Sequence, residues 1–274
     1  MIIDAHTHIG YWPSLRESKK ILLRSMKNEN VNYAIFSSDA SETISPDHLE
    51  RKDTSSISSL LIAQDALQFT KRHSNLFMLY WIKPKKELLS NEIKSFILNN
   101  SNIIKGLKIH PCLSKLKITS PKYIPYIKFA EENNLPILVH TAQDKYSDIS
   151  YLKKVALLYP KVTFIAAHLQ LLSNNLAGLE AITSVPNIYG DTAWVNASVV
   201  KLAIKNGLAK KIMFGTDLPI DGDRTYKEDI YQAYFTNTLH FNKKAYEDIM
   251  FNNANKIYKL NISKNTKITY NANN

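Results

Sequence analysis

The sequence predicts an α/β protein whose parallel strands close into a single-domain (β/α)8 TIM barrel. Three observations support this fold class. Short apolar segments rich in β-branched residues alternate with longer amphipathic segments along nearly all of the 274 residues. Several short segments are apolar on both faces, as parallel strands covered by helices are. The chain length also suits this barrel, which typically uses about 250 residues.

Eight segments have the pattern of buried strands. Pro136–Val139 and Val162–Ala167 show it most clearly, because both strand faces are apolar there. The eight predicted strands are Ile2–His8, Val31–Ser37, Leu76–Ile82, Ile103–His110, Leu135–His140, Val162–His168, Asn187–Asp191 and Ile212–Asp217.

A helical period follows each predicted strand. The predicted helices are Leu15–Asn28, Ser56–Arg72, Glu87–Asn99, Tyr123–Asn133, Ile149–Leu158, Leu171–Ile182, Ser198–Asn206 and Tyr226–Leu239. A doubly wound open sheet is the alternative fold. It is disfavoured because no Gly-rich phosphate-binding turn follows the first strand.

The predicted barrel occupies residues 1–260. Residues 38–56 form a long polar segment after the second strand, on the face where a lid over a site would lie. A surface loop without a role is an equal alternative for this segment. Residues 261–274 are polar, and we expect a tail there.

The composition favours a cytoplasmic globular protein. Hydrophobic residues make up 45% of the chain and charged residues 22%, which is ordinary for a folded domain. An apolar run of about 18 residues, as a membrane span needs, does not occur. The N-terminus lacks the basic and apolar regions of a secretory signal. The single cysteine, Cys112, suits a reducing compartment.

The net charge of +11 could indicate a nucleic-acid partner. However, the basic residues are scattered, mostly as lysines on predicted helices. The chain has no arginine-rich arm and no basic stripe interleaved with aromatic residues. We therefore expect a small-molecule substrate, and neither nucleic acid nor membrane as a partner.

Side chains suited to metal binding gather at the carboxyl ends of the predicted strands. His6 and His8 are two residues apart, so they point to one face of the first strand. Asp4 is expected on that face too, one layer deeper. A parallel barrel brings all its strand ends to one mouth, where later strands place His110, His140, His168 and Asp217. Imidazoles with a carboxylate suit Zn²⁺ best, with Mn²⁺ or Fe²⁺ as alternatives.

An ordered set of motifs resembles the amidohydrolase superfamily. The first strand carries an H-x-H motif, and similar strand ends and a closing helix follow in the expected order: Ile3–His8, Gly106–Pro111, Pro136–Thr141, Phe164–His168, Phe214–Pro219 and Asn253–Tyr258. The resemblance is to the amidohydrolase-related branch, which includes aminocarboxymuconate-semialdehyde decarboxylase-like enzymes. It covers essentially the whole chain.

The resemblance implies that one metal ion is bound by His6, His8, His140 and Asp217, with a water molecule completing the shell. Asp217 and His168 are then the expected catalytic residues. Asp217 would accept a proton from the water and deliver it to the leaving group. His168 would orient the water, or bind a second metal ion.

The fourth strand leaves the number of metal ions open. Dinuclear members of the superfamily bridge two ions with a carboxylated lysine or a glutamate there, and this chain has Lys108 and His110. Lys108 could be carboxylated, bind an anionic substrate or line the barrel unmodified. We prefer an unmodified lysine and one ion. Lys108, His110 and Arg224 are the expected substrate contacts.

The leading functional hypothesis is a metal-dependent hydrolase of a small amide, lactone or ester that uses a metal-activated water. The alternative is a non-oxidative decarboxylase on the same metal site, with Lys108 or Arg224 as a cationic anchor. A TatD-like nuclease is disfavoured because the fourth strand lacks a glutamate. A barrel without catalysis is disfavoured because it has no need for convergent histidines. The resemblance also suggests a homodimer.

Overall fold

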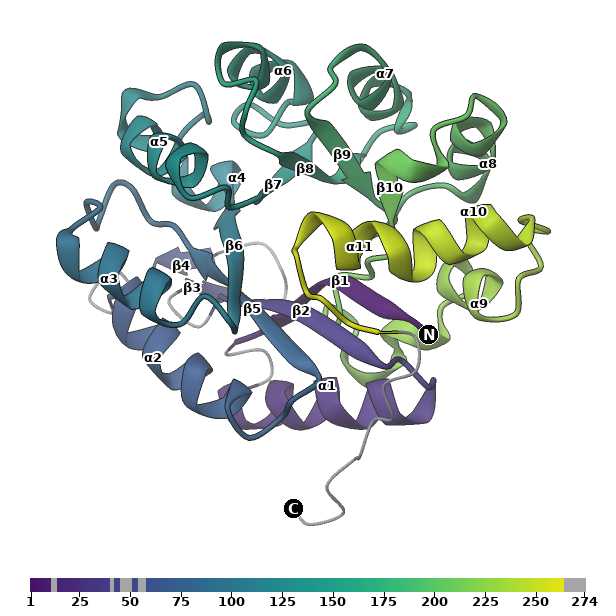
Figure 1. Ribbon diagram of the computed structural model, residues 1–274, viewed down its shortest axis with the longest axis horizontal. Helices are drawn as coiled ribbons and strands as arrows, with labels where there is room; N and C mark the ends of the chain where they lie inside the picture. Colours follow the sequence, from purple (N-terminus) through teal and green to yellow (C-terminus); the bar gives the residue numbers. More distant parts are fainter. Residues whose placement is uncertain (11–13, 40–41, 45–50, 54–57, 264–274) are drawn as a thin grey trace.

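Eight parallel strands form a barrel surrounded by helices (Figure 1). The computed structural model describes residues 1–10, 14–39, 42–44, 51–53 and 58–263. The strand order is β1-β2-β5-β6-β7-β8-β9-β10, with each pair parallel. An isolated parallel bridge between Thr7 and Leu218 joins the first strand to the segment after the last. The predicted (β/α)8 barrel is thus confirmed.

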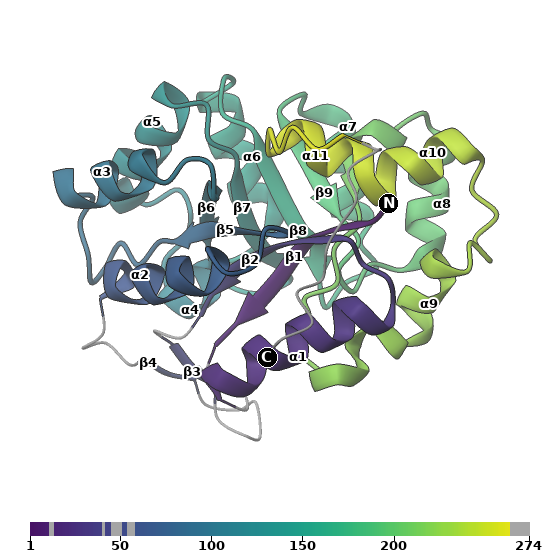
Figure 2. The same cartoon turned by 60° about the horizontal axis from the view of Figure 1, so that its bottom comes forward.

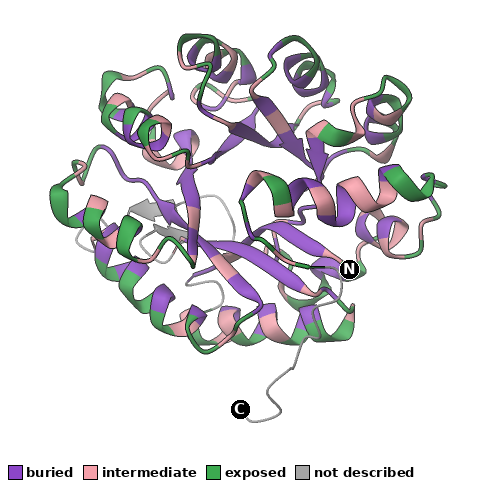
Figure 3. Cartoon of the chain, in the orientation of Figure 1, coloured by how far each residue is buried: buried purple, intermediate pink, exposed green. Residues whose placement is uncertain are grey.

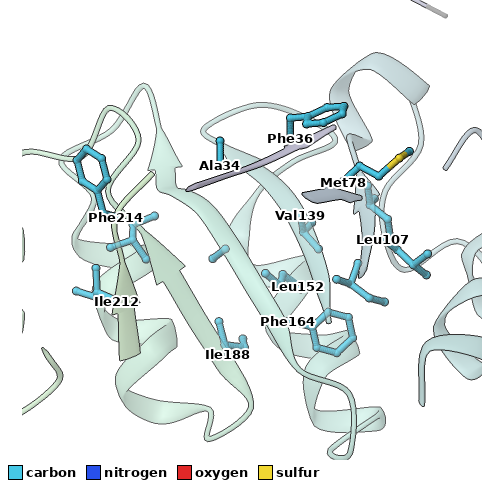
Figure 4. Close-up of a cluster of buried hydrophobic side chains, with 14 of the residues drawn as sticks. Ala34, Phe36, Met78, Leu107, Val139, Leu152, Phe164, Ile188, Ile212 and Phe214 are labelled. Carbon is cyan, nitrogen blue, oxygen red and sulfur yellow. The ribbon is translucent and has the colours of Figure 1, made fainter. Parts of the chain in front are cut away.

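The barrel strands lie where the apolar segments predicted them. Their bounds are β1 Ile3–Ile9, β2 Tyr33–Ser38, β5 Leu76–Trp81, β6 Ile104–Ile109, β7 Ile137–Ala142, β8 Phe164–Leu171, β9 Ile188–Asp191 and β10 Ile212–Met213. Successive residues point alternately into the barrel and toward the helices. Ile35, Leu138 and Ile165 belong to the interior cluster, whereas their neighbours Phe36 and Val139 pack in the larger outer cluster (Figure 4).

The eighth strand was predicted to run to Asp217, and this prediction is wrong. β10 ends at Met213. After Met213, the hydroxyl of Thr192 replaces a neighbouring strand as the hydrogen-bond partner of the backbone. It accepts the N–H of Gly215 at 3.1 Å and donates to the carbonyl of Gly215 at 2.9 Å. The backbone stays attached to β1, because the N–H of Asp217 donates to the carbonyl of His6 at 2.7 Å. Asp217 therefore sits on a loop at the barrel mouth.

The outer helices are α1 Leu15–Asn28, α2 Ser59–Thr70, α3 Asn91–Asn99, α5 Ile124–Glu132, α6 Ile149–Leu158, α7 Leu176–Ser184, α8 Ala197–Lys205 and α9 Asp229–Phe235. Their outer faces are exposed, while the strands beneath them are buried (Figure 3). Serine side chains cap the starts of the first three of these helices. Among the described residues, no helix combines the length and apolarity that a bilayer crossing requires.

Shorter elements complete the fold. They are α4 Pro111–Ser114, the 3₁₀ helices η1 Pro121–Tyr123, η2 Ala209–Lys211 and η3 Gly222–Lys227, and the closing series α10 Lys243–Glu247, the π-helix η4 Asp248–Asn252 and α11 Asn253–Ile257. Phe251 and Ala254 of the closing series, and Tyr258 just after it, pack in the interior cluster with Ile3 and Met213. These helices therefore close the end of the barrel that lies opposite the site (Figures 1 and 2).

The long segment after β2 contains regular structure that was not predicted. β3 Glu42–Ile44 pairs antiparallel with β4 Arg51–Asp53. Strands of three residues are too short to show a period of two in the sequence. Residues 40–41, 45–50 and 54–57 of this segment lie outside the described residues, as do residues 264–274 of the expected tail. The lid and the tail stay predictions.

Candidate metal centre

Three donor atoms from the two ends of the chain meet at the carboxyl end of the barrel. Nε2 of His6 lies 3.1 Å from Nε2 of His8 and 3.3 Å from Oδ1 of Asp217. Nε2 of His8 lies 3.0 Å from the same oxygen. Two ligands that are each about 2.0–2.2 Å from one divalent ion lie about 2.8–3.6 Å apart at octahedral or tetrahedral angles. The triangle thus has the size of one face of a coordination shell.

Hydrogen bonds on the far side of both rings point these donor atoms into the site. Nδ1 of His6 lies 2.8 Å from Oδ2 of Asp191, and both side chains are fully buried. An ionised carboxylate only accepts, so this contact assigns the proton of His6 to Nδ1 and leaves a lone pair on Nε2. Nδ1 of His8 lies 3.1 Å from the hydroxyl of Ser37 on the neighbouring strand. The residues present therefore fit a divalent cation.

Asp191 was missed by the sequence reasoning, although a signal existed. The signal is its position: Asp191 ends the seventh predicted strand, just as His140 ends the fifth. Its other oxygen, Oδ1, accepts the backbone N–H groups of His168 at 2.9 Å and Ala193 at 3.1 Å. One buried carboxylate therefore orients His6 on β1 and fixes the backbone of His168 on β8.

Asp4 does not share the inward face with His6, contrary to expectation. The register between β1 and β2 shifts between Asp4 and Thr7, so β1 contains an extra residue, and the side chains beyond it change face. Asp4 points away from the mouth, where its carboxylate accepts hydrogen bonds from the hydroxyls of Thr216 at 2.5 Å and Tyr226 at 2.9 Å. Burial raises the pKa of Asp4 to about 7, although these hydrogen bonds oppose the shift. Asp4 thereby ties β1 to the loop that carries Asp217.

His168 opens a bulge in left-handed conformation. His140 pairs with Ala167, but Ala142 pairs with Leu171, so three residues of β8 stand opposite Thr141 alone. These three residues, His168, Leu169 and Gln170, have φ values of 66°, 44° and 77°. A left-handed L-residue costs about 1–2 kcal/mol, so the surroundings must hold this bulge in place.

The imidazole of His168 faces the metal donors. Its Nδ1 lies 3.0 Å from the carbonyl of Ala193, which assigns the proton to Nδ1 and leaves Nε2 as the acceptor. One donor atom each from His6, His168 and Asp217 lies within 4.8 Å of the others. Among the described residues, this group includes neither His8 nor His140. The ring of His140 lies 4.9 Å from that of His168 and stacks on that of His110 at 3.9 Å.

Burial sets the protonation of the cluster. It lowers the pKa values of His6, His8 and His168, because a buried imidazolium loses its hydration. Burial alone would raise the pKa of Asp217, but the hydrogen bond with His8 and the electrostatic interactions with the three imidazoles outweigh it and hold that pKa well below its usual range. Neutral imidazoles and an ionised carboxylate are the forms that bind a divalent cation.

Lys108 places a positive charge beside the donor triangle. Its side chain is buried, and Nζ lies 2.9 Å from Nε2 of His6. Burial lowers the pKa of Lys108 to about 8, while the carboxylates of Asp217, Asp191 and Asp39 oppose the shift. The ammonium form therefore predominates at pH 7.

A cavity of about 280 Å³ opens beside the donors. This is close to the lower end of the range of small-molecule pockets, about 300 Å³. The cavity is lined by Trp81, Lys108, His110, His140, Trp194 and Asp217, among others. Arg224, an expected substrate contact, is instead exposed on η3 and is not among the described residues that line this cavity.

Six aromatic side chains at the site contact one another in sequence, and the last contacts the first. The successive centroid distances are His6–His8 5.1 Å, His8–Trp81 6.0 Å, Trp81–His110 5.7 Å, His110–His140 3.9 Å, His140–His168 4.9 Å and His168–His6 5.0 Å. Trp81 ends β5 but has no metal-binding side chain, so the pattern of ligands at strand ends does not reveal it. Four of these rings, those of His8, Trp81, His110 and His140, line the cavity.

Comparisons with known proteins agree with this architecture. The sequence profile of the amidohydrolase family matches residues 3–260. An uncharacterised TIM-barrel protein from Bordetella bronchiseptica shares 17% identity at a TM-score of 0.66, covering 94% of this chain and 98% of that chain. No curated protein sequence matches significantly.

Two further solved structures have named activities. One is a probable 2-pyrone-4,6-dicarboxylic acid hydrolase from Acinetobacter baumannii, with 11% identity, a TM-score of 0.63 and coverage of 94% of this chain and 99% of that chain. The other is a 5-carboxyvanillate decarboxylase from Novosphingobium aromaticivorans complexed with manganese, with 13% identity, a TM-score of 0.67 and coverage of 95% and 96%. At these identities the neighbours show a shared fold. The profile spans nearly the whole chain and confirms the resemblance of the strand-end motifs, so this protein belongs to the amidohydrolase family and is an enzyme of that superfamily.

Proposed function

We propose that this protein is a divalent-metal-dependent hydrolase of a small amide, lactone or ester that carries a carboxylate. The observation that carries the proposal is the triangle formed by His6 Nε2, His8 Nε2 and Asp217 Oδ1, with sides of 3.0–3.3 Å. It lies beside a cavity whose volume suits a small substrate.

His6, His8 and Asp217 would hold one ion, with His140 or His168 as a further ligand. A set of imidazoles and a carboxylate suits Zn²⁺, Mn²⁺ or Fe²⁺. The decarboxylase neighbour contains manganese, which supports including Mn²⁺ in any test. A single ion is proposed because His6 and Asp217 belong both to the triangle with His8 and to the group with His168, and because the adjacent Lys108 ammonium disfavours a second cation.

When bound, the cation acts as a Lewis acid and lowers the pKa of water toward about 7. The protein supplies the remaining chemistry. Asp217 and His168 each present an acceptor atom that can take a proton from the attacking water and return it to the leaving group. Lys108 can hold the carboxylate of the substrate, since its ammonium is buried at the cavity wall.

Non-oxidative decarboxylation is the second candidate, because one structural neighbour is named a decarboxylase, and Lys108 could bind the substrate carboxylate in either reaction. Its Nζ lies 2.9 Å from a proposed metal ligand, so a carboxylate bound there would lie between two positive charges. The names of both neighbours describe carboxylic acids. His110, stacked on His140 at the cavity wall, is a proposed contact for the rest of the substrate. Arg224 is no longer favoured as the anchor, because it is exposed.

The products distinguish the two reactions. Hydrolysis adds water to an amide, lactone or ester and forms a new carboxylate, whereas decarboxylation converts R–COO⁻ and a proton to R–H and CO₂. A panel of lactones, esters, amides and aromatic acids would be tested with Mn²⁺ or Zn²⁺, with the organic products identified by mass spectrometry and total CO₂ measured after acidification. A product heavier by one water without CO₂ supports hydrolysis. Stoichiometric CO₂ with the shortened product R–H supports the second candidate, and activity in Asp217→Asn equal to wild type would contradict both.

The expected partner is a small molecule, and a homodimer also stays a proposal. Equilibrium sedimentation at several protein concentrations would test the dimer. A mass of one chain throughout would refute it. Binding of duplex DNA or RNA at physiological salt would contradict the proposal that the scattered lysines are only solvated surface groups.

A further inference from the structure

We propose that Asn175 is a positioning residue that sets the orientation of His168 and couples it to the cavity wall carrying Trp194. Asn175 contacts neither the metal donors nor the cavity in the contacts described above. The inference rests on the proposed metal site for its effect on metal binding. Its geometric part, the orientation of His168, can be tested without metal.

The amide of Asn175 holds the inside of the left-handed bulge. Its Nδ2 donates to the carbonyl of His168 at 2.9 Å, and makes longer contacts to the carbonyls of Leu169 at 3.4 Å and Gln170 at 3.2 Å. The side chain of Asn175 is buried. Three consecutive left-handed residues turn their carbonyls toward one point, and this amide occupies it. The hydroxyl of Ser173 adds a bond to the last carbonyl at 2.6 Å.

The ends of the bulge have other anchors. The hydroxyl of Thr141 accepts the N–H of Gln170 at 2.9 Å and donates to the carbonyl of Ala167 at 2.6 Å. Asp191 accepts the N–H of His168 at 2.9 Å. Neither anchor reaches the carbonyl of His168, so the plane of the peptide that follows His168 depends on Asn175.

The same amide reaches the neighbouring wall. Oδ1 of Asn175 accepts the backbone N–H of Asn196 at 3.1 Å. Asn196 ends the loop after β9, and this loop carries Trp194, which lines the cavity and has a φ of 58°. His168 and Trp194 are therefore linked through one side chain that uses its donor and its acceptor at once.

Asparagine suits this position for two reasons. The backbone of Asn175 has a φ of 60°, a region that asparagine tolerates better than most residues. The site also needs a donor group on one side and an acceptor on the other. Aspartate keeps the shape but cannot donate, and glycine tolerates the backbone but has no side chain.

Asn187 is a matched control elsewhere in the barrel. Its Nδ2 also donates to three backbone carbonyls, those of Ala156 at 3.1 Å, Tyr159 at 3.0 Å and Val162 at 2.8 Å. Asn187 directly precedes β9, at the end opposite the mouth, and its partners lie in α6 and on the α6–β8 connection. Asn187→Asp removes the same kind of donor without touching the site.

The test compares Asn175→Asp and Asn175→Gly with Asn187→Asp. In metal-free protein labelled with ¹⁵N-histidine, ring-nitrogen NMR reports which nitrogen of His168 carries the proton, with His168→Gln assigning the signal. We expect the Nδ1-protonated signal in wild type and Asn187→Asp, and its loss in both Asn175 variants. In parallel, the Mn²⁺ affinity of each protein would be measured from the EPR signal of the unbound ion. We expect this affinity to be about 10–100-fold lower in the Asn175 variants than in wild type, and little changed in Asn187→Asp.

Each outcome decides a separate point. An unchanged His168 signal in Asn175→Gly overturns the proposal, as does its loss in Asn187→Asp, which would show a general loss of order. If neither Asn175 variant folds while Asn187→Asp does, Asn175 is needed for folding and the positioning role is refuted. If wild type binds no Mn²⁺, the proposed metal site fails, and the metal-free NMR spectra still decide the role of Asn175.

Discussion

The carboxylate of Asp191 lies 2.8 Å from Nδ1 of His6, with both side chains fully buried. The other oxygen of Asp191 accepts the N–H of His168, so the carboxylate connects β1, β8 and β9. A buried carboxylate that orients an imidazole ligand is a common partner of metal sites. Asp191 should therefore affect metal affinity without touching the metal.

Asp191→Asn should weaken Mn²⁺ binding about 10–100-fold. The amide of asparagine has one accepting oxygen, so its NH₂ group must face either Nδ1–H of His6 or the N–H groups near His168. The Mn²⁺ affinity would be measured by EPR of the free ion. Asp144→Asn is the control, because Asp144 also accepts two backbone N–H groups, at 2.7 and 3.0 Å. Equal affinities for the two variants would contradict the role of Asp191.

Gly215→Ala should separate the same pair. A Cβ at Gly215 would lie 2.9 Å from Cβ of His6 and 3.2 Å from Cβ of Asp191. Neither atom is the end of a flexible chain, so backbone must move. We expect a loss of about 1–3 kcal/mol in the free energy of unfolding and weaker Mn²⁺ binding, measured by urea titration and EPR.

Gly207→Ala is the control for strain alone. Gly207 has a φ of 78° and nothing within 4 Å of its would-be Cβ, so the substitution costs stability far from the site. Its Mn²⁺ affinity should equal that of wild type. If Gly215→Ala bound Mn²⁺ as tightly as wild type, the prediction would be wrong, because metal binding would then not depend on the exact positions of His6 and Asp191.

Lys108→Met should strengthen metal binding. The ammonium of Lys108 lies 2.9 Å from Nε2 of His6 and repels a divalent cation held by that atom, so its removal should raise the Mn²⁺ affinity by at least about threefold. The same variant should bind benzoate, as a simple carboxylate, more weakly. A large loss of metal in Lys108→Met would instead indicate a carboxylated lysine, and the intact mass of the wild-type protein would then show the added CO₂.

Metal should stabilise the folded chain. At a free Mn²⁺ concentration of one hundred times Kd, binding to the folded state alone adds about 2.7 kcal/mol to the free energy of unfolding. Thermal unfolding with Mn²⁺ and with EDTA would measure this effect. In His8→Ala the difference should largely disappear, because one corner of the donor triangle is missing. A shift of the same size in wild type and His8→Ala would place the bound metal elsewhere.

Much of the fold and the convergence of the site could be predicted from the sequence. Apolar runs located all eight barrel strands, because strands covered on both faces are apolar throughout. The parallel barrel then required His6, His8 and Asp217 to meet, although the first and last are separated by most of the chain. Their roles as ligands, and that of His140, remain predictions that the measurements above address.

The features that sequence patterns missed are local departures from regular strands. The extra residue in β1 turned Asp4 away from His6, and the left-handed bulge carries β8 past His168 to Leu171. The predicted helix Leu171–Ile182 accordingly begins only at Leu176. The β8 bulge is stabilised by single side chains outside it, Asn175 a few residues further on and Asp191 and Thr141 much further away, so no periodic pattern reveals it.

A Mn²⁺-soaked crystal, examined by anomalous diffraction at the manganese edge, tests the central claim most directly. The account predicts a single strong peak per chain, within about 2.0–2.4 Å of Nε2 of His6, Nε2 of His8 and Oδ1 of Asp217. Absence of a peak at fully occupying Mn²⁺, or a peak whose ligands exclude the His6–His8 pair, would contradict it.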